Sequence, residues 1–196
     1  MKVYRLIAVE AAENAANGVR DAHLESLGVF STVAKAEAMI RIHADKVKEY
    51  ATMLGYVLYE NELDDLSTHG PWNDIPEFLS VRTYLADGTL NAFCDCDDAC
   101  EKQWRGRDAE TIRFRRGDFV SVWRGKSIHT ELVGELPYTR ERGYVGDWTD
   151  DCYLTYPVDG FHEHPFTPYV FPLVGKLTAR VRAKLEAARD KDEDMA

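Results

Sequence analysis

The C-terminal part of the chain contains two histidines whose spacing could support metal binding or catalysis. His162 and His164 are separated by one residue, so in an extended segment both side chains point to the same side. Asp150 and Asp151 precede them, and these residues could together form a site of two histidines and one carboxylate. This cluster predicts a small metal-dependent hydrolase. The alternative is a surface loop that joins a strand to the last helix, because nothing in the sequence brings the acids to the histidines.

The cysteines form a second possible site. Cys94, Cys96 and Cys100 are close in the sequence, and Cys152 could complete a tetrahedral zinc site. Structural zinc sites usually take their ligands as two close pairs, whereas Cys152 has no second cysteine near it. The chain would then be a structural zinc protein, with zinc as its cofactor. The alternative is a set of reduced cysteines in a protein that needs no cofactor.

A third group combines tryptophan and arginine in an otherwise acidic chain. Trp104, Arg113 and Trp123 belong to a stretch rich in positive charge. Small barrels bind peptides or single-stranded nucleic acid with aromatic platforms and basic rims, so we expect a face that binds a peptide or protein partner. The alternative is that Trp123 packs in a core and the arginines form a solvated face. The candidate ligand-binding residues are therefore Trp104, Arg113, Trp123, Asp150, Asp151, Tyr153, His162 and His164.

Composition and missing motifs argue against several functional classes. The net charge of −10 over 196 residues disfavours a protein that binds duplex nucleic acid by neutralising phosphates. No apolar run approaches the roughly 18 residues that a membrane span needs, and the first residues do not read as a signal peptide. A phosphate loop, a dinucleotide fingerprint and a Gly-x-Ser-x-Gly elbow are all absent. We therefore expect a cytoplasmic protein that does not associate with membranes.

The elements that would position these residues fall into two halves, and residues 1–65 predict a strand–helix–strand unit. Residues 2–9 are apolar on both faces, which is typical of a central strand. Residues 10–26 are polar and predict a loop, followed by a short strand at residues 29–30. A helix then starts at an N-cap, Ser31 or Thr32, and runs to about Leu54, with Gly55 as its C-terminal glycine. Residues 56–63 predict the next strand.

The second half predicts a small barrel. Residues 66–78 are rich in proline and glycine and indicate a linker or a large ordered loop. Residues 79–172 then contain short strands, with a hairpin around Asp87-Gly88 and a strand entry at Gly117-Asp118. Such strands must close or stack to hide their edges, and an SH3-like barrel is the simplest solution. Residues 173–196 predict an amphipathic helix and a charged tail.

Several of these motifs together resemble a family of uncharacterised bacterial proteins. The resemblance rests on residues 28–32 before an alanine-rich helix, on Gly117-Asp118, and on residues 150–153 before His162 and His164. It extends from the first strand to about Pro172. The resemblance implies the fold and brings no activity with it.

The sequence thus predicts an α+β protein: a strand–helix–strand half, an SH3-like barrel and a C-terminal helix. The expected function is that of a non-catalytic binding or regulatory module of the bacterial cytoplasm. Its partner would dock on the barrel face or on the acidic–histidine loop. The metal-dependent hydrolase and the structural zinc protein remain alternatives, and the sequence leaves the oligomeric state open.

Overall fold

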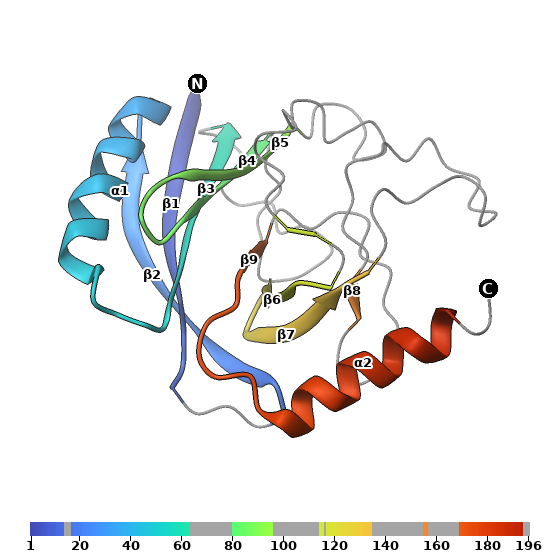
Figure 1. Cartoon of the computed structure of the whole chain (residues 1–196). Helices are drawn as coiled ribbons and strands as arrows, with labels where there is room; N and C mark the ends of the chain where they lie inside the picture. Colours follow the sequence, from blue (N-terminus) through green and yellow to red (C-terminus); the bar gives the residue numbers. More distant parts are fainter. Residues whose placement is uncertain are drawn as a thin grey trace, which may run out of the picture.

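The computed structural model describes residues 1–13, 17–62, 80–95, 114–115, 117–134, 155–156 and 169–193. Within these ranges, strands of one continuous sheet outnumber the helices, of which there are two (Figure 1). The elements are β1 (Lys2–Ala11), β2 (Val19–Phe30), α1 (Val33–Val47), β3 (Met53–Glu62), β4 (Ser80–Leu85), β5 (Leu90–Asp95), β6 (Phe119–Arg124), β7 (Ser127–Val133), β8 (Thr155–Tyr156), β9 (Val170–Pro172) and α2 (Ala179–Glu193).

The sheet curls into a nearly closed barrel. Its strand order is β5-β4-β3-β1-β2-β7-β6-β9, with β8 added beside β7. The two ends of this path meet through a side chain: the amide nitrogen of Asn91 in β5 donates to the carbonyl oxygen of Val170 in β9 at 2.8 Å. The same nitrogen lies 3.1 Å from the hydroxyl oxygen of Thr83. An α+β protein with a barrel-like sheet is therefore confirmed in outline.

Apolar side chains fill the inner face of the barrel. Residues of β1 alternate between two apolar clusters, with Ile7 and Val9 in the inner cluster and Leu6 and Ala8 in the outer one. This explains why both faces of the strand are apolar, as the sequence predicted for a central strand. The inner cluster unites strands from both halves of the chain: Ile7, Val9, Ala11, Leu54, Val57, Tyr59, Val81, Trp123, Ile128 and Phe171.

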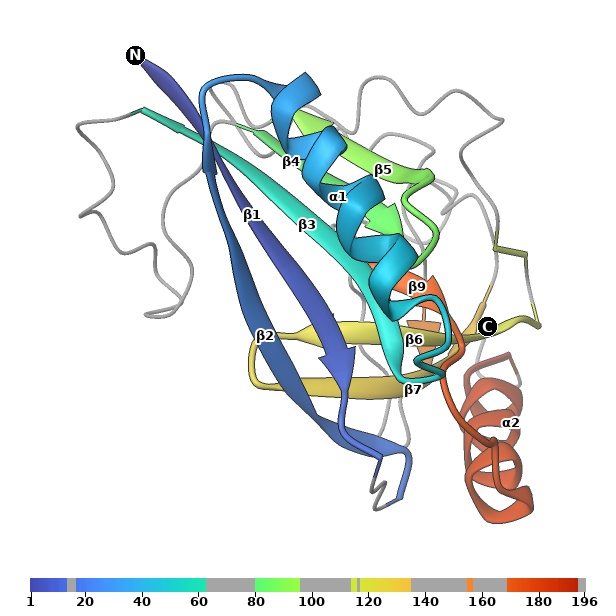
Figure 2. The ribbon, with the colours of Figure 1, turned by 90° about the vertical axis from the view of Figure 1, so that its left-hand side faces the viewer.

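Helix α1 covers part of the outer face of the sheet (Figure 2). The hydroxyl of Thr32 accepts a hydrogen bond from the main-chain N–H of Lys35 at 3.3 Å, which confirms the predicted N-cap. Ala36, Ile40 and Ala44 are buried against the sheet, as their helical spacing predicted. The small alanines let the helix approach the strands closely, so the outer core is compact beneath α1.

The end of α1 differs from the prediction. The helix stops at Val47, and a turn follows in which the N–H of Tyr50 donates to the carbonyl of Val47 at 2.8 Å. Gly55, expected as the C-terminal glycine of the helix, lies inside β3. A Cβ atom at this position would overlap the carbonyl oxygen of Tyr84 in the neighbouring strand, so close strand packing explains the glycine.

The predicted loop at residues 10–26 is wrong for most of the residues that the structure describes in this range, because they belong to two strands. β1 continues to Ala11, and β2 begins at Val19 and pairs with β1 through to Phe30. The residues expected as a separate short strand, 29–30, are the end of β2. β2 is largely exposed, so its pattern lacks the apolar alternation that marks a half-buried strand.

Two predicted turns of the second half are confirmed. The carboxylate of Asp87 accepts from the N–H of Thr89 at 2.8 Å, closing the β4–β5 hairpin at Gly88. The carboxylate of Asp118 accepts from the N–H of Arg115 at 2.7 Å, just before β6. β6 and β7 follow as an antiparallel pair, and the two residues of β8 pair with the end of β7.

The C-terminal helix starts later than predicted. α2 begins at Ala179 instead of residue 173, and the hydroxyl of Thr178 accepts from the N–H of Val181 at 3.2 Å. Val181 and Leu185 bury their side chains against Leu132 of β7. Among the described residues, no helix is long and apolar enough to cross a membrane.

Candidate functional site

Most of the site residues proposed from the sequence lie outside the described part of the chain. For Cys94 the structure describes the main chain in β5 and not the side chain. Within the described ranges, no cluster of three or more His, Cys, Asp or Glu side chains could hold a metal ion. The hydrolase and zinc hypotheses stay predictions. The residues outside the described ranges are Trp104, Arg113, Asp150, Asp151, Tyr153, His162, His164, Cys96, Cys100 and Cys152.

Trp123 is a core residue in the structure. Its side chain belongs to the inner cluster, and only 4% of the residue is exposed. The indole N–H donates to the carbonyl of Gly125, and the ring meets Tyr169 edge-on with centroids 5.0 Å apart. The expected aromatic platform therefore does not include this indole, and the core-packing alternative describes it correctly.

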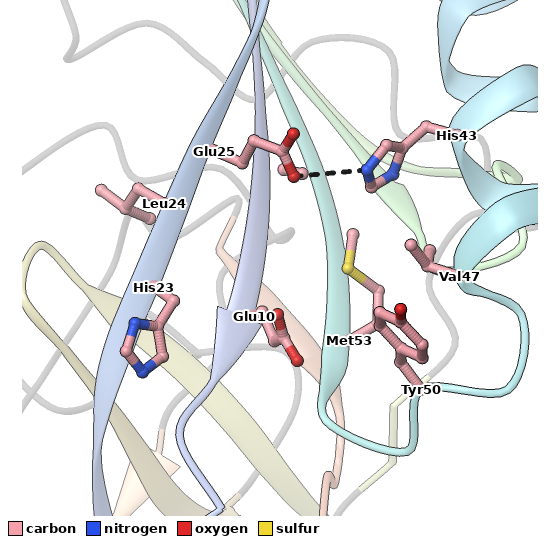
Figure 3. A pocket seen from close by; sticks show the side chains of 9 residues that line it. Glu10, His23, Leu24, Glu25, His43, Val47, Tyr50 and Met53 are labelled. Atoms are coloured by element: carbon pink, nitrogen blue, oxygen red, sulfur yellow. Dashed lines mark ion pairs between the residues drawn. The ribbon is translucent and has the colours of Figure 1, made fainter.

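A pocket of about 310 Å³ opens on the outer face of the sheet, beside the last turn of α1 (Figure 3). The pocket exists because α1 ends at Val47 and leaves the C-terminal part of β1, and the part of β2 that pairs with it, uncovered. The volume is at the small end of the range typical of ligand pockets. Its lining combines acidic, imidazole, aromatic and aliphatic side chains: Ala8, Glu10, His23, Leu24, Glu25, His43, Val47, Tyr50 and Met53.

The strand register brings the polar part of this lining together. In the β1–β2 ladder, Glu10 lies opposite His23 and Ala8 lies opposite Glu25. Side chains of directly opposed residues share one face of a sheet, so all four lie on the side of α1. Figure 3 shows Glu10, His23 and Glu25 on neighbouring strands, with His43 facing them from the helix. Two carboxylates thus border one small cavity.

His43 is held between a phenol and a carboxylate. Its Nδ1 lies 3.2 Å from the hydroxyl oxygen of Tyr56, and its Nε2 lies 3.4 Å from the Glu25 carboxylate. Burial, and secondarily the nearby charge of Glu25, raises the pKa of Tyr56 to about 12, so the phenol stays protonated at neutral pH. The phenol and the carboxylate thus each face one of the two ring nitrogens of His43. This fixes the orientation of the ring.

The remaining walls determine which ligand chemistry suits the pocket. Glu10 accepts a hydrogen bond from the hydroxyl of Thr52 at 2.6 Å, which orients its carboxylate. Val47 and Met53 provide an apolar wall, and the Tyr50 ring stands at the mouth with 57% of the residue exposed. The pocket is negative on one side and apolar on the other, which favours a cation carried on an aliphatic stem.

No family model, no curated protein and no solved structure matches this chain.

Sequence reasoning missed this site because it placed two of its residues in a loop. His23 and Glu25 have the period-two spacing of one strand face, and this is the signal that could have revealed them. His43 lies one turn after Ile40 and one turn before Val47 on the apolar side of α1. A histidine in that stripe indicates a polar partner across the interface, which the structure identifies as Tyr56.

Three buried tyrosines, Tyr56, Tyr59 and Tyr84, predict a loss of stability in alkaline solution. Burial raises the pKa of Tyr56 to about 12, and burial also raises the pKa of Tyr59 and of Tyr84, which donates to Glu37. The folded state holds these protons more tightly than the unfolded chain, where the ordinary value of 10.0 applies. The stabilisation is complete below about pH 10 and is lost as the pH rises through the folded values.

Urea unfolding between about pH 9 and pH 11.5 measures this effect. The free energy of unfolding should fall by up to about 1.4 kcal/mol per pH unit for each such tyrosine. Tyr84→Phe should make the slope shallower, whereas Tyr50→Phe should leave it unchanged because Tyr50 is exposed. A free energy that stays constant over this range would contradict the interpretation.

Proposed function

We propose that the chain is a non-catalytic binding module whose pocket receives an amine or a guanidinium on an aliphatic stem. The observation that carries the proposal is the convergence of Glu10 and Glu25 on one cavity with an apolar opposite wall. Val47, Met53 and the Tyr50 ring offer contacts to the methylene groups of such a ligand. Lysine and arginine side chains, and small molecules of the same shape, have this chemistry.

The role of His43 supports binding over catalysis. The Tyr56 hydroxyl and the Glu25 carboxylate each contact one of its ring nitrogens, and the described lining contains no serine, threonine or cysteine as a nucleophile. Its imidazole orients Glu25 at the edge of the cavity. The proposal also retains an SH3-like arrangement for residues 79–172. The antiparallel pairing of β6 with β7 and β9 supports it, whereas β4 and β5 pair on the far side of β1, beside β3.

The proposal predicts selective binding of small cations. Agmatine, which carries a guanidinium on an aliphatic chain, should bind in an NMR titration and shift the amide signals of β2 and the end of α1. Glu25→Gln should weaken this binding up to about 5-fold, because a carboxylate whose side chain is 69% exposed contributes at most about 1 kcal/mol to a cation contact. Added salt should weaken the binding as well.

Asp45→Asn is the matched control for charge. Asp45 is an exposed carboxylate on α1 whose side chain is 81% accessible and pairs with Lys48, outside the pocket lining. It removes the same unit of charge, so equal losses for both variants would show a general effect of net charge instead of a site. A neutral urea analogue of the same length should not bind. Binding of that analogue as tightly as agmatine would refute the cation pocket.

A further inference from the structure

β2 has an open main-chain edge along the part of the strand that borders the pocket. Residues 19–21 pair with β7 on this side, and the N–H of Ala22 donates to the carbonyl of Lys126 at 2.9 Å. From His23 to Phe30, β1 pairs with the other side of β2, and no strand within the described ranges pairs on this edge. Figure 2 shows this half of β2 at the margin of the sheet, above the β6–β7 hairpin. An unpaired edge is a template for an added strand.

The hydrogen-bonding groups of this edge follow from the strand alternation. Main-chain groups of alternate residues in a strand face the same neighbour. Ala22 directs its N–H to the β7 side, so Leu24 and Ser26 direct theirs to the open continuation of that side. A register shift in the β1–β2 ladder follows Ser26 and forms a bulge, which ends the regular stretch. The open, regular edge therefore runs from His23 to Ser26.

Two common devices against pairing, lysine and proline, are missing from this edge. Many edge strands carry a lysine or a proline that disfavours an added strand, whereas residues 23–30 contain neither. Instead, Leu24 is 49% exposed and Val29 is 56% exposed. An added strand would cover apolar surface of Leu24 as well as satisfy the main-chain groups.

The pocket specifies the side chain that such a strand would carry. His23 and Glu25 project from the same strand to the outer face, where they line the pocket. Residues of an added strand beside them would place their Cβ atoms about 4.5–5.5 Å away on that face. A lysine or arginine there would pair with Glu25 and extend toward Glu10.

We propose that the edge from His23 to Ser26 receives an extended basic segment of a partner protein, with a lysine or arginine of that segment in the pocket. This inference rests on the proposed cation pocket and names its ligand class. A second copy of the chain is a poorer occupant, because residues 23–30 contain no lysine or arginine to offer to Glu25. Two chains of net charge −10 also repel each other.

N-methylated peptides test the main-chain part of the proposal. The probe is a blocked peptide of about five residues with arginine at alternate positions, as strand addition requires. Two derivatives carry N-methyl groups at the odd or at the even positions, so that in an added strand one set faces β2 and the other faces away. We expect one derivative to lose more than tenfold in affinity and the other to bind like the parent. Equal affinities for the two derivatives would overturn strand addition.

Amide hydrogen exchange gives a second, independent test of strand addition. The parent peptide should slow the exchange of Leu24 and Ser26 at least about tenfold, since these amides gain a partner. Ser26→Pro removes one donor from the edge and should abolish peptide binding while agmatine still binds. If this variant fails to fold, the N-methylated peptides and the exchange rates of the native chain still decide the question.

The outcomes separate this inference from the proposed function. Agmatine binding without slowed exchange at Leu24 and Ser26 on peptide addition would refute the strand and leave the pocket standing. Peptide binding with slowed exchange but without agmatine binding would support the strand and refute the pocket as a separate cation site. Slow exchange at both amides in a concentration-dependent dimer, without peptide, would identify a second copy as the occupant and overturn the proposal.

Discussion

Gly55→Ala is expected to lower the free energy of unfolding by about 3 kcal/mol or more, at the upper end of the range for overpacked cores. A methyl group at this position would overlap the main-chain carbonyl oxygen of Tyr84 and approach the Phe171 ring to 2.9 Å. The carbonyl belongs to the β3–β4 ladder, where Gly55 pairs with Leu85 and Tyr56 pairs with Tyr84. Relief therefore requires that the strands separate. Urea denaturation of the variant and the native chain measures the loss.

Gly125→Ala provides the control for this substitution. Gly125 lies in the β6–β7 turn with φ of +63°, and a Cβ atom there would meet no other atom within 4 Å. Its replacement should cost about 1 kcal/mol, which is the backbone penalty of the left-handed conformation alone. If Gly55→Ala costs no more than Gly125→Ala, the close strand contact is not what requires the glycine.

Phe171→Ala is expected to destabilise the protein by about 3–5 kcal/mol, the range for a deleted buried aromatic side chain. The residue is fully buried in β9 and belongs to the inner cluster, where it lies against Gly55 of β3. Its loss leaves a cavity at the seam of the barrel, where the side chain of Asn91 joins the two ends of the sheet. Thermal or urea unfolding measures the change.

A double variant separates the clash with the Phe171 ring from the overlap with the Tyr84 carbonyl. Combining Gly55→Ala with Phe171→Leu relieves the ring contact but leaves the overlap with the Tyr84 carbonyl. The combined loss should therefore fall below the sum of the two single losses only by the part that comes from the ring contact. Full rescue by Phe171→Leu would show that the ring, and not the neighbouring strand, is the obstacle. In each folded variant agmatine binding should persist, because the pocket lies on the opposite face of the sheet.

Local chemistry made several elements predictable. Thr32 caps α1 with its own hydroxyl. The hairpin at Asp87-Gly88 is closed by a hydrogen bond from the N–H of Thr89 to the carboxylate of Asp87. Both signals act over a few residues, so they can be read without knowledge of the fold. The apolar faces of β1 likewise indicate burial on two sides, which the inner and outer clusters confirm.

Long-range packing concealed the rest. Leu54 has the helical spacing of α1 but points into the barrel from β3, so periodicity extended the predicted helix too far. β2 was missed because His23 and Glu25 occupy the face that would otherwise be apolar. The residues that build the pocket are therefore the same ones that hide the strand. The pairing of Glu10 with His23 depends on a register that no local pattern specifies.

The seam of the barrel constrains how the chain can fold during its synthesis. The Asn91–Val170 hydrogen bond joins residues 79 positions apart, and β9 lies close to the C-terminal helix in the sequence. The ribosome must therefore have synthesised the chain through β9 before the two ends of the sheet can meet. Until then the nascent protein exposes the β5 edge and the inner face that Phe171 later covers. The time that passes before β9 emerges from the ribosome thus determines how long the growing chain needs protection from aggregation.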